Sequence, residues 1–202
     1  MSGKFIVIEG LDGSGKTTHS ALLGTALTER GFDVWHTAEP TGGTFGRLCR
    51  QALSGKIDCS KTLLASLFVA DRIEHNIELK EKLEQGKTVI CDRYYYSNMA
   101  YQGIDTSLEW LRDMNKGCPD IRRPDLCVFL DLEPKKSMER ILSARDESEI
   151  EIYETEEKLA GIRQRFFDAF DALTDENIAI VSSDGTIEQV SERILNAVLG
   201  LQ

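Results

Sequence analysis

The sequence predicts an α/β protein with a five-stranded parallel sheet between two layers of helices, a three-layer α/β/α fold. Five short runs rich in apolar residues have the length of strands, and most lack the alternation of a strand with one wet face. Amphipathic segments of helical length separate these runs, a pattern typical of parallel sheets. Because no linker or repeat interrupts the pattern, we expect residues 1–202 to form a single domain.

The expected strands are, in chain order, residues 5–9 (FIVIE), 32–39 (FDVWHTAE), 88–92 (TVICD), 126–132 (LCVFLDL) and 178–183 (IAIVSS). Such continuous apolar runs suit parallel strands that helices cover on both faces. Cys91 and Cys127 lie inside two of the runs and are therefore expected in the core.

The expected helices are residues 17–30, 61–84, 155–173 and 186–199. In the third of these, Leu159, Ile162 and Phe166 recur at the spacing of one helix face. Gly31 and Gly86 follow the first two helices, and glycine is a natural C-terminal cap.

Charge and cysteine content limit the classes of partner and location. The formal net charge is −10, which argues against a nucleic-acid polymer as a partner, because basic patches supply that affinity. No apolar run approaches the roughly 20 residues of a membrane span, and a strand-like segment begins almost at the N-terminus, so we expect no membrane association and no signal peptide. The five cysteines include no C-x-x-C pair, which indicates reduced thiols and a cytoplasmic location.

A glycine-rich loop stands between the first expected strand and the first helix. Residues 10–17 read G-L-D-G-S-G-K-T and match the pattern G-x-x-x-x-G-K-[ST]. Glycines let consecutive N–H groups point at one anion, which the N-terminus of the following helix also attracts. We therefore predict a P-loop NTPase fold that binds the phosphates of ATP through Gly10, Leu11, Asp12, Gly13, Ser14, Gly15, Lys16, Thr17 and Thr18. Lys16 is expected to reach the β- and γ-phosphates, and Thr17 to offer its hydroxyl to Mg²⁺.

A second polar block, CDRYYYSNMAYQG (91–103), directly follows the strand 88–92. Asp92 ends that strand and so faces the crevice in which parallel sheets bind ligands. It is the expected Mg²⁺ carboxylate, directly or through water, with Asp131 as its rival, and Arg93 could bind a phosphate bidentately. The absence of an N-K-x-D motif argues against a GTPase, and the length argues against a motor. A small-molecule kinase is therefore favoured.

Taken together, these blocks resemble the thymidylate kinases, a family of nucleoside monophosphate kinases, over essentially the whole chain. The matching segments are IEGLDGSGKTT (8–18), EPTGGTFG (39–46), LFVADR (67–72), DRYYYSNMAYQG (92–103) and SSDGT (182–186). The resemblance implies transfer of the γ-phosphate of ATP to dTMP, with Mg²⁺ as cofactor. It also implies a homodimer, for which residues 44–53 and 61–79 are candidate surfaces.

The resemblance also implies roles for residues of the acceptor site. Phe68 would stack on the thymine ring, Arg72 would hydrogen-bond a base carbonyl, and Arg93 would bind the monophosphate. Asn98 would meet the far edge of the base, and Tyr101 would lie against the sugar at its 2′ position. Further implied contacts with dTMP are Glu39, Pro40, Gln102 and Tyr153, with Asp184 and Gly185 beside the adenine. From the residues alone, Phe68 also suits a core aromatic and Arg72 a surface ion pair.

A third cation is expected besides Lys16 and Mg²⁺, because phosphoryl transfer spreads negative charge over the moving group. In this family an arginine supplies it, from the P-loop or from a lid. Gly13 stands at the P-loop position, so the lid at about 144–158 should supply it through Arg145. Arg163 and Arg165, on the next helix, are the alternatives. The implied catalytic set is Lys16, Asp12, Arg93 and Arg145.

Two other functions remain open from the sequence. One is a kinase that acts on another nucleoside monophosphate or on a deoxynucleoside. The other is a degenerate ATP-binding interaction module, which the scarcity of arginines in the lid region keeps under consideration. A turnover assay separates them, because such a module would bind ATP and transfer nothing.

Overall fold

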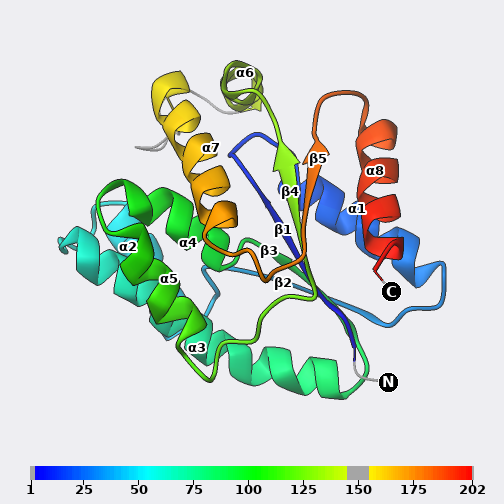
Figure 1. Ribbon diagram of the computed structural model, residues 1–202, viewed down its shortest axis with the longest axis horizontal. Coiled ribbons are helices and arrows are strands. Elements are labelled where there is room, and N and C mark those ends of the chain that lie inside the picture. The colour runs from blue at the N-terminus through cyan, green and yellow to red at the C-terminus, as the bar shows by residue number, and fades with distance from the viewer. Residues whose placement is uncertain (1–2, 145–154, 202) are drawn as a thin grey trace.

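The computed structural model describes residues 3–144 and 155–201, which are arranged around one five-stranded sheet (Figure 1). The strands are β1 (Phe5–Gly10), β2 (Val34–Ala38), β3 (Thr88–Asp92), β4 (Leu126–Asp131) and β5 (Ile178–Ser182). All pairings are parallel, in the order β2-β3-β1-β4-β5. The predicted parallel sheet is confirmed. Because β1 lies at its centre, the loop after β1 opens into the crevice between the two halves of the sheet.

The helices are α1 (Lys16–Thr28), α2 (Thr44–Leu53), α3 (Lys61–Glu84), α4 (Tyr95–Tyr101), α5 (Leu108–Lys116), α6 (Pro134–Ala144), α7 (Glu156–Asp171) and α8 (Ile187–Leu199), with a 3-10 turn η1 (Gln102–Ile104). The four predicted helices are confirmed as α1, α3, α7 and α8. The prediction missed α2, α4, α5 and α6. In α4 every residue is buried, so its sequence shows no polar face at helical spacing.

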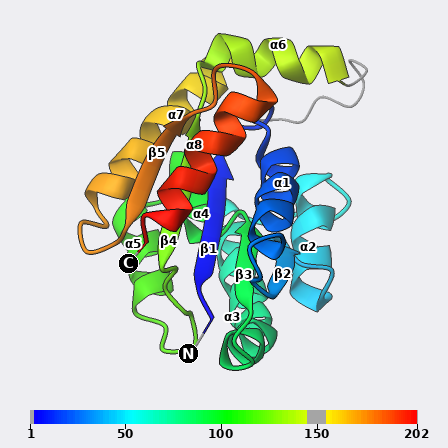
Figure 2. The same cartoon turned by 90° about the vertical axis from the view of Figure 1, so that its right-hand side faces the viewer.

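Helices cover both faces of the sheet, as predicted for three layers (Figures 1 and 2). On one face, alternate strand residues such as Val7 and Phe129 pack against α3, α4, α5 and α7. On the other, Ile8 and Val128 pack against α1 and α8. Both strand faces are therefore apolar, which is why these strands lack alternation in sequence. The predicted core cysteines Cys91 and Cys127 are both fully buried.

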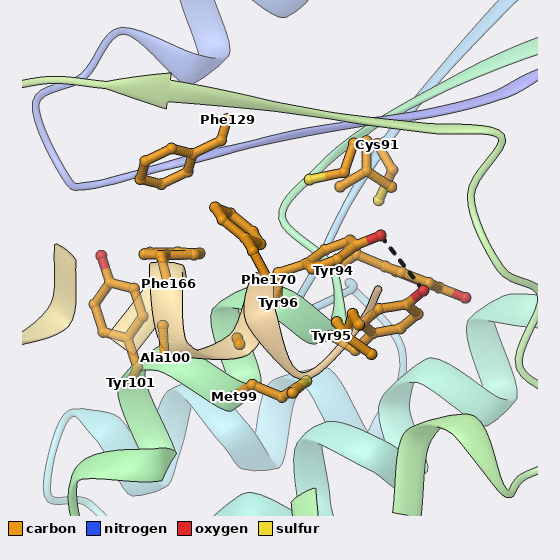
Figure 3. Packing of buried hydrophobic residues seen from close by; sticks show 14 of the residues in the cluster. Cys91, Tyr94, Tyr95, Tyr96, Met99, Ala100, Tyr101, Phe129, Phe166 and Phe170 are labelled. Atoms are coloured by element: carbon orange, nitrogen blue, oxygen red, sulfur yellow. Dashed lines mark hydrogen bonds between the residues drawn. The ribbon is translucent and has the colours of Figure 1, made fainter. Parts of the chain in front are cut away.

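Aromatic side chains fill the space between α4 and α7 (Figure 3). The rings of Phe129 and Phe166 lie 4.9 Å apart, and Tyr101 meets Phe166 edge to face at 6.2 Å. Tyr96 packs against Phe170 at 6.0 Å. These contacts hold α4, which carries several of the predicted acceptor residues, against the body of the protein.

A buried carboxylate sets the start of α4. Glu9, in β1, accepts hydrogen bonds from the backbone nitrogens of Tyr94 (2.8 Å) and Ser97 (3.0 Å) and from the Ser97 hydroxyl (2.6 Å). Burial raises the pKa of Glu9 above its ordinary value, although these hydrogen bonds oppose the rise. A carboxylate at a helix N-terminus satisfies N–H groups that lack intrahelical partners. Glu9 thereby ties the segment that begins with Arg93 to the loop after β1.

None of the helices in the described part of the chain has an apolar stretch long enough to cross a membrane.

Candidate functional site

The glycine-rich loop turns between β1 and α1 with two residues in the left-handed region, Gly13 (φ 77°) and Gly15 (φ 89°). A Cβ on Gly13 would lie 2.7 Å from the backbone oxygen of Ser137 in α6, so α6 packs directly on this turn. Ser137 also donates a hydrogen bond from its hydroxyl to the backbone oxygen of Asp12. Glycine is therefore required at position 13 by backbone angle and by space.

The side chain of Lys16 is held within the loop. Its Nζ donates to the backbone oxygen of Leu11 at 2.8 Å and lies 3.7 Å from a carboxylate oxygen of Asp12. Burial lowers the pKa of Lys16 to about 8, and the neighbouring positive charge of Arg93 adds to this shift. An ammonium group desolvated in this way gains from an anion that arrives beside it. The loop thus offers a buried cation for phosphate.

Thr17 and Asp92 meet where the P-loop faces the end of β3. The Thr17 hydroxyl donates to Oδ2 of Asp92 at 2.7 Å. The other carboxylate oxygen, Oδ1, is buried and has no hydrogen-bond partner among the residues the structure describes. A hydroxyl beside an unsatisfied carboxylate oxygen fits Mg²⁺, which prefers oxygen ligands and keeps several waters. In residues 3–144 and 155–201, no cluster of three or more His, Cys, Asp or Glu offers a denser metal site.

The rival carboxylate, Asp131, is already engaged. Its two oxygens accept hydrogen bonds from Nε and Nη2 of Arg163, at 2.6 and 2.8 Å. This bidentate pair engages both side chains, and neither residue lines the cavity that Lys16 and Arg72 share. The geometry therefore favours Asp92 over Asp131 and leaves Arg163 poorly placed as a source of the third cation.

Arg93 lies beside the P-loop in a strained conformation. Its φ of 67° is in the left-handed region, which costs a non-glycine residue about 1–3 kcal/mol. Its Nη2 donates to Asp12, and its Nη1 lies 3.3 Å from the Ser97 hydroxyl. Although burial alone would lower the pKa of Arg93, Asp12 and Tyr101 raise it well above its ordinary value. The guanidinium is thus a fixed positive charge next to Lys16.

Tyr101 completes this group from α4. Its hydroxyl donates to Oδ2 of Asp12 at 3.0 Å, and the Arg93 guanidinium lies over its ring at 5.2 Å. Burial raises the pKa of Tyr101, so the hydroxyl stays protonated and remains a donor. The predicted residues Asp12, Arg93 and Tyr101 therefore contact one another.

A second buried group surrounds Arg72 in α3. Arg72 forms an ion pair with Glu39 at 2.6 Å, and the two side chains are 1% and 2% exposed. Glu39 also lies 2.9 Å from Nδ1 of His75, and the Arg72 guanidinium lies 4.9 Å from the centre of the Tyr94 ring. The interpretation of Arg72 as a surface ion pair is wrong, because the pair is buried. Arg72 Nη1 also donates to Asn115 in α5, at 2.7 Å.

Both groups line one cavity of about 670 Å³. Its wall includes the predicted residues Asp12, Gly13, Gly15, Lys16, Thr17, Thr18, Glu39, Pro40, Phe68, Arg72, Asp92, Arg93, Asn98, Tyr101 and Gln102. The predicted residues Gly10, Leu11 and Ser14 do not line this cavity, and Leu11 is instead a core residue. Phe68 is half-buried and is not among the residues of the two core clusters.

Other predicted residues lie away from this cavity or outside the described chain. Asp184 is exposed and pairs with Lys136 at 2.6 Å, and neither it nor Gly185 lines the cavity. Arg165 lies near Gly103 in η1 and also does not line it. Arg145 and Tyr153 fall outside the described residues, together with most of the predicted lid at 144–158.

The structure adds two arginines that the sequence interpretation did not place in the site. Arg140, in α6, lines the cavity and donates to the backbone oxygens of Gly13 (3.4 Å) and Ser183 (3.1 Å). Arg50, in α2, also lines the cavity and donates to the backbone oxygens of Pro40 and Thr41. Neither belongs to a motif, and only their helices bring them here, so no local sequence signal could have identified them.

The chain is similar over nearly its whole length to known proteins. Residues 8–194 match the family model of thymidylate kinase. The chain is 40% identical over 203 residues to a probable thymidylate kinase of Pyrococcus abyssi (strain GE5 / Orsay), with 96% of this chain and 95% of that protein covered. It is 36% identical over 201 residues to a probable thymidylate kinase of Methanococcus aeolicus, with 97% and 96% covered. A solved structure of thymidylate kinase from Candida albicans matches with a TM-score of 0.80 and 29% identity, covering 98% of this chain and 92% of that one. By this family model and these relatives, the chain belongs to the thymidylate kinase family.

Proposed function

We propose that the protein transfers the γ-phosphate of ATP to dTMP, giving ADP and dTDP for the synthesis of dTTP. One observation carries this proposal. A single cavity joins a P-loop lysine, Lys16, to a second site that contains an aromatic ring, Phe68, and a buried arginine, Arg72. A donor and an acceptor nucleotide could therefore meet in one space, as phosphoryl transfer between them requires.

The P-loop residues would bind the phosphates of ATP. The backbone N–H groups of the loop residues that line the cavity, together with the N-terminus of α1, would provide donors for the phosphate oxygens. Burial holds the pKa of Lys16 near 8, because its ammonium group is desolvated. A phosphate that replaces the contact with the Leu11 oxygen would stabilise this charged form. Thr17 and Asp92 would hold Mg²⁺, directly or through water. When bound, Mg²⁺ would offset the negative charge of the phosphates that the acceptor approaches.

Arg93 and Asp12 would position the acceptor phosphate. An oxygen of dTMP attacks the γ-phosphorus, the bond to the bridging oxygen of ADP breaks, and ADP leaves. No general base is needed, because a phosphate monoester near neutral pH is already largely ionised. The guanidinium of Arg93 is held in place by Asp12 and Ser97, so it would bind the acceptor phosphate without first losing rotamer freedom.

The base and sugar would lie against α3 and α4. Phe68 would stack on the thymine ring, which is worth roughly 1–3 kcal/mol per base. Arg72 and Asn98 would hydrogen-bond its edge, with Gln102 beside them. Tyr101 would lie against the sugar at the 2′ position and disfavour a ribose hydroxyl. Glu39 and Pro40 would support this pocket, and the ion pair between Glu39 and Arg72 supports that assignment.

The third cation would come from α6 or from the segment that follows it. Arg145 remains the predicted residue, and Tyr153 a predicted contact with the acceptor. Arg140 is an additional candidate, because it already lies between the P-loop and the loop after β5. Asp184 and Gly185, in that loop, would lie beside the adenine. The whole of 1–202 would act as one domain, with a lid at about 144–158.

A homodimer and a cytoplasmic location complete the proposal. The exposed side chains of Leu63 and Ile77 lie on one face of α3, with Leu67 and Ala70 between them. An apolar helix face of this kind suits contact with a second copy of the chain. Sedimentation analysis of the wild type and of Ile77→Lys would test it, with a shift of the variant towards the monomer expected. The five free cysteines support a reducing compartment.

The decisive assay measures ADP release from ATP and Mg²⁺ with dTMP, dUMP, ribo-TMP, dCMP, AMP, GMP and thymidine as separate acceptors. We expect a strong preference for dTMP, and we expect Lys16→Ala to remove transfer to every acceptor. Preference for another acceptor would retain the kinase and reject the proposed base pocket. ATP binding without transfer to any acceptor would favour a degenerate binding module.

A further inference from the structure

Asn115 lies directly behind the wall of the proposed base pocket. It is part of α5, its side chain is 1% exposed, and it does not line the cavity. Even so, it connects two residues that do line the cavity. Arg72 Nη1 donates to its Oδ1 at 2.7 Å, and its Nδ2 donates to Oδ1 of Asn98 at 3.3 Å. A third bond, at 2.8 Å, runs from Nδ2 to the backbone oxygen of Leu111.

The orientation of the Asn115 amide follows from chemistry, because one of its partners can only donate a hydrogen bond and another can only accept one. A guanidinium can only donate, so the atom that faces Arg72 must be the amide oxygen. A backbone carbonyl can only accept, so the atom that faces Leu111 must be the amide nitrogen. A flipped Asn115 would place two donors together and two acceptors together at a position that is only 1% exposed.

This fixed orientation propagates to the residues in the cavity wall. Because Asn115 presents N–H to Asn98, the facing atom of Asn98 must be its oxygen. The nitrogen of Asn98 then faces Gln102 and donates to Oε1 at 3.1 Å. Asn98 is 2% exposed and Gln102 6% exposed, so water competes little with these bonds. The direction of donation thus runs from Arg72 through Asn115 and Asn98 to Gln102.

We propose that Asn115 is a positioning residue that sets the pattern of donors and acceptors the pocket shows to the base, and thereby favours thymine over cytosine. The proposal rests on the proposed function, in which Arg72 and Asn98 meet the base edge. Asn115 itself touches neither substrate nor phosphate. It acts through Arg72 and Asn98, whose amide could otherwise flip.

The two pyrimidines differ at the edge concerned. Thymine presents a carbonyl oxygen at C4 and an N–H at N3, whereas cytosine presents an amino group at C4 and an acceptor at N3. An arginine donor and an amide oxygen match thymine at both positions. The Asn98 oxygen accepts one hydrogen bond from Asn115, and an amide oxygen can accept a second from the base. Cytosine would meet donor against donor and acceptor against acceptor.

The test is Asn115→Asp, which keeps the oxygen that accepts from Arg72 and removes both N–H donors. Asn98 should then turn its nitrogen towards position 115 and present N–H to the base. We expect the ratio of kcat/KM for dTMP to that for dCMP to fall at least about tenfold, the size expected of a hydrogen-bonding mismatch. The ratio for dTMP to dUMP should stay within about twofold, because uracil presents the same edge as thymine. KM for ATP should also stay within about twofold.

Asn76→Asp is the matched control. Asn76 is equally buried at 1%, and it bonds the backbone oxygen of Arg72 and the Tyr94 hydroxyl but no other cavity residue. It should lower the melting temperature and leave both ratios unchanged. If Asn115→Asp does not fold, Asn115→Ala, which admits water beside Arg72, should shift the dTMP to dCMP ratio in the same direction by at least about fivefold.

The outcomes separate this inference from the proposed function. A wild type that transfers no phosphate to dTMP would overturn both. A wild type that prefers dTMP, with an unchanged dTMP to dCMP ratio in the folded Asn115 variants, would overturn only the role of Asn115. A fall of that ratio in Asn76→Asp as large as in Asn115→Asp would also overturn it, because general loosening of the pocket would then explain the effect.

Discussion

Replacing Arg72 with alanine should destabilise the fold as well as weaken the binding of dTMP. The guanidinium neutralises Glu39, whose side chain is only 2% exposed, at a distance of 2.6 Å. Without it, a carboxylate remains buried with His75 as its remaining close partner. Removing one partner of a buried ion pair costs about 3–5 kcal/mol. In a chain of this size each 1 kcal/mol corresponds to about 2–4 °C, so the melting temperature should fall by roughly 6–20 °C.

A double-mutant cycle with Glu39→Gln isolates this cost. The glutamine removes the buried charge, so Arg72→Ala with Glu39→Gln should be more stable than Arg72→Ala alone by about 2 kcal/mol or more. Urea denaturation followed by circular dichroism gives the four free energies of unfolding. Isothermal calorimetry with dTMP and with ATP, at a temperature where every variant is folded, then shows whether the loss of affinity is confined to dTMP.

Two results would refute this reasoning. A cost below about 1 kcal/mol for Arg72→Ala would mean that the pair with Glu39 is not buried as the structure describes. Equal losses of affinity for dTMP and ATP would remove the argument that Arg72 meets the base.

Three further predictions concern the P-loop and α6. Lys16→Ala should lower turnover by at least about a thousandfold without loss of melting temperature. In the wild type, KM for ATP should rise above about pH 8, because Lys16 then loses the proton that favours phosphate binding. A KM that stays constant from pH 7 to 9 would contradict the low pKa of Lys16. Gly13→Ala should lower the free energy of unfolding, measured in urea, by more than Gly31→Ala. Both glycines have positive φ, but only at position 13 would the added Cβ contact a neighbour, the Ser137 backbone oxygen at 2.7 Å. Equal losses near 1 kcal/mol would indicate that backbone strain alone is responsible. Arg140→Ala should lower kcat/KM for ATP about tenfold and leave KM for dTMP unchanged in steady-state assays, and an unchanged kcat/KM for ATP would exclude Arg140 from the nucleotide site.

Local patterns predicted the elements whose signal lies in their own residues. The strands appear as apolar runs because both faces are covered, and α3 and α7 as repeats of apolar residues at helical spacing. The short helix α4 has no such signal, because its residues are buried on every side by α7, β1 and the rest of the core. Its position depends on Glu9, which lies 85 or more residues earlier in the chain. No window of sequence contains both partners.

The site divides along the same line. By itself, the sequence determined the phosphate loop, since the spacing of its glycines, Lys16 and Thr17 is set by local backbone geometry. Only the tertiary structure showed that Arg163, from α7, already occupies both oxygens of Asp131, whereas Oδ1 of Asp92 has no hydrogen-bond partner among the described residues. It likewise brought Arg140 into the cavity and placed Asn115 between Arg72 and Asn98. Arg72, Asn115 and Asn98 come from separate helices. The hydrogen bonds that join them become strong only when folding removes both partners of each bond from water.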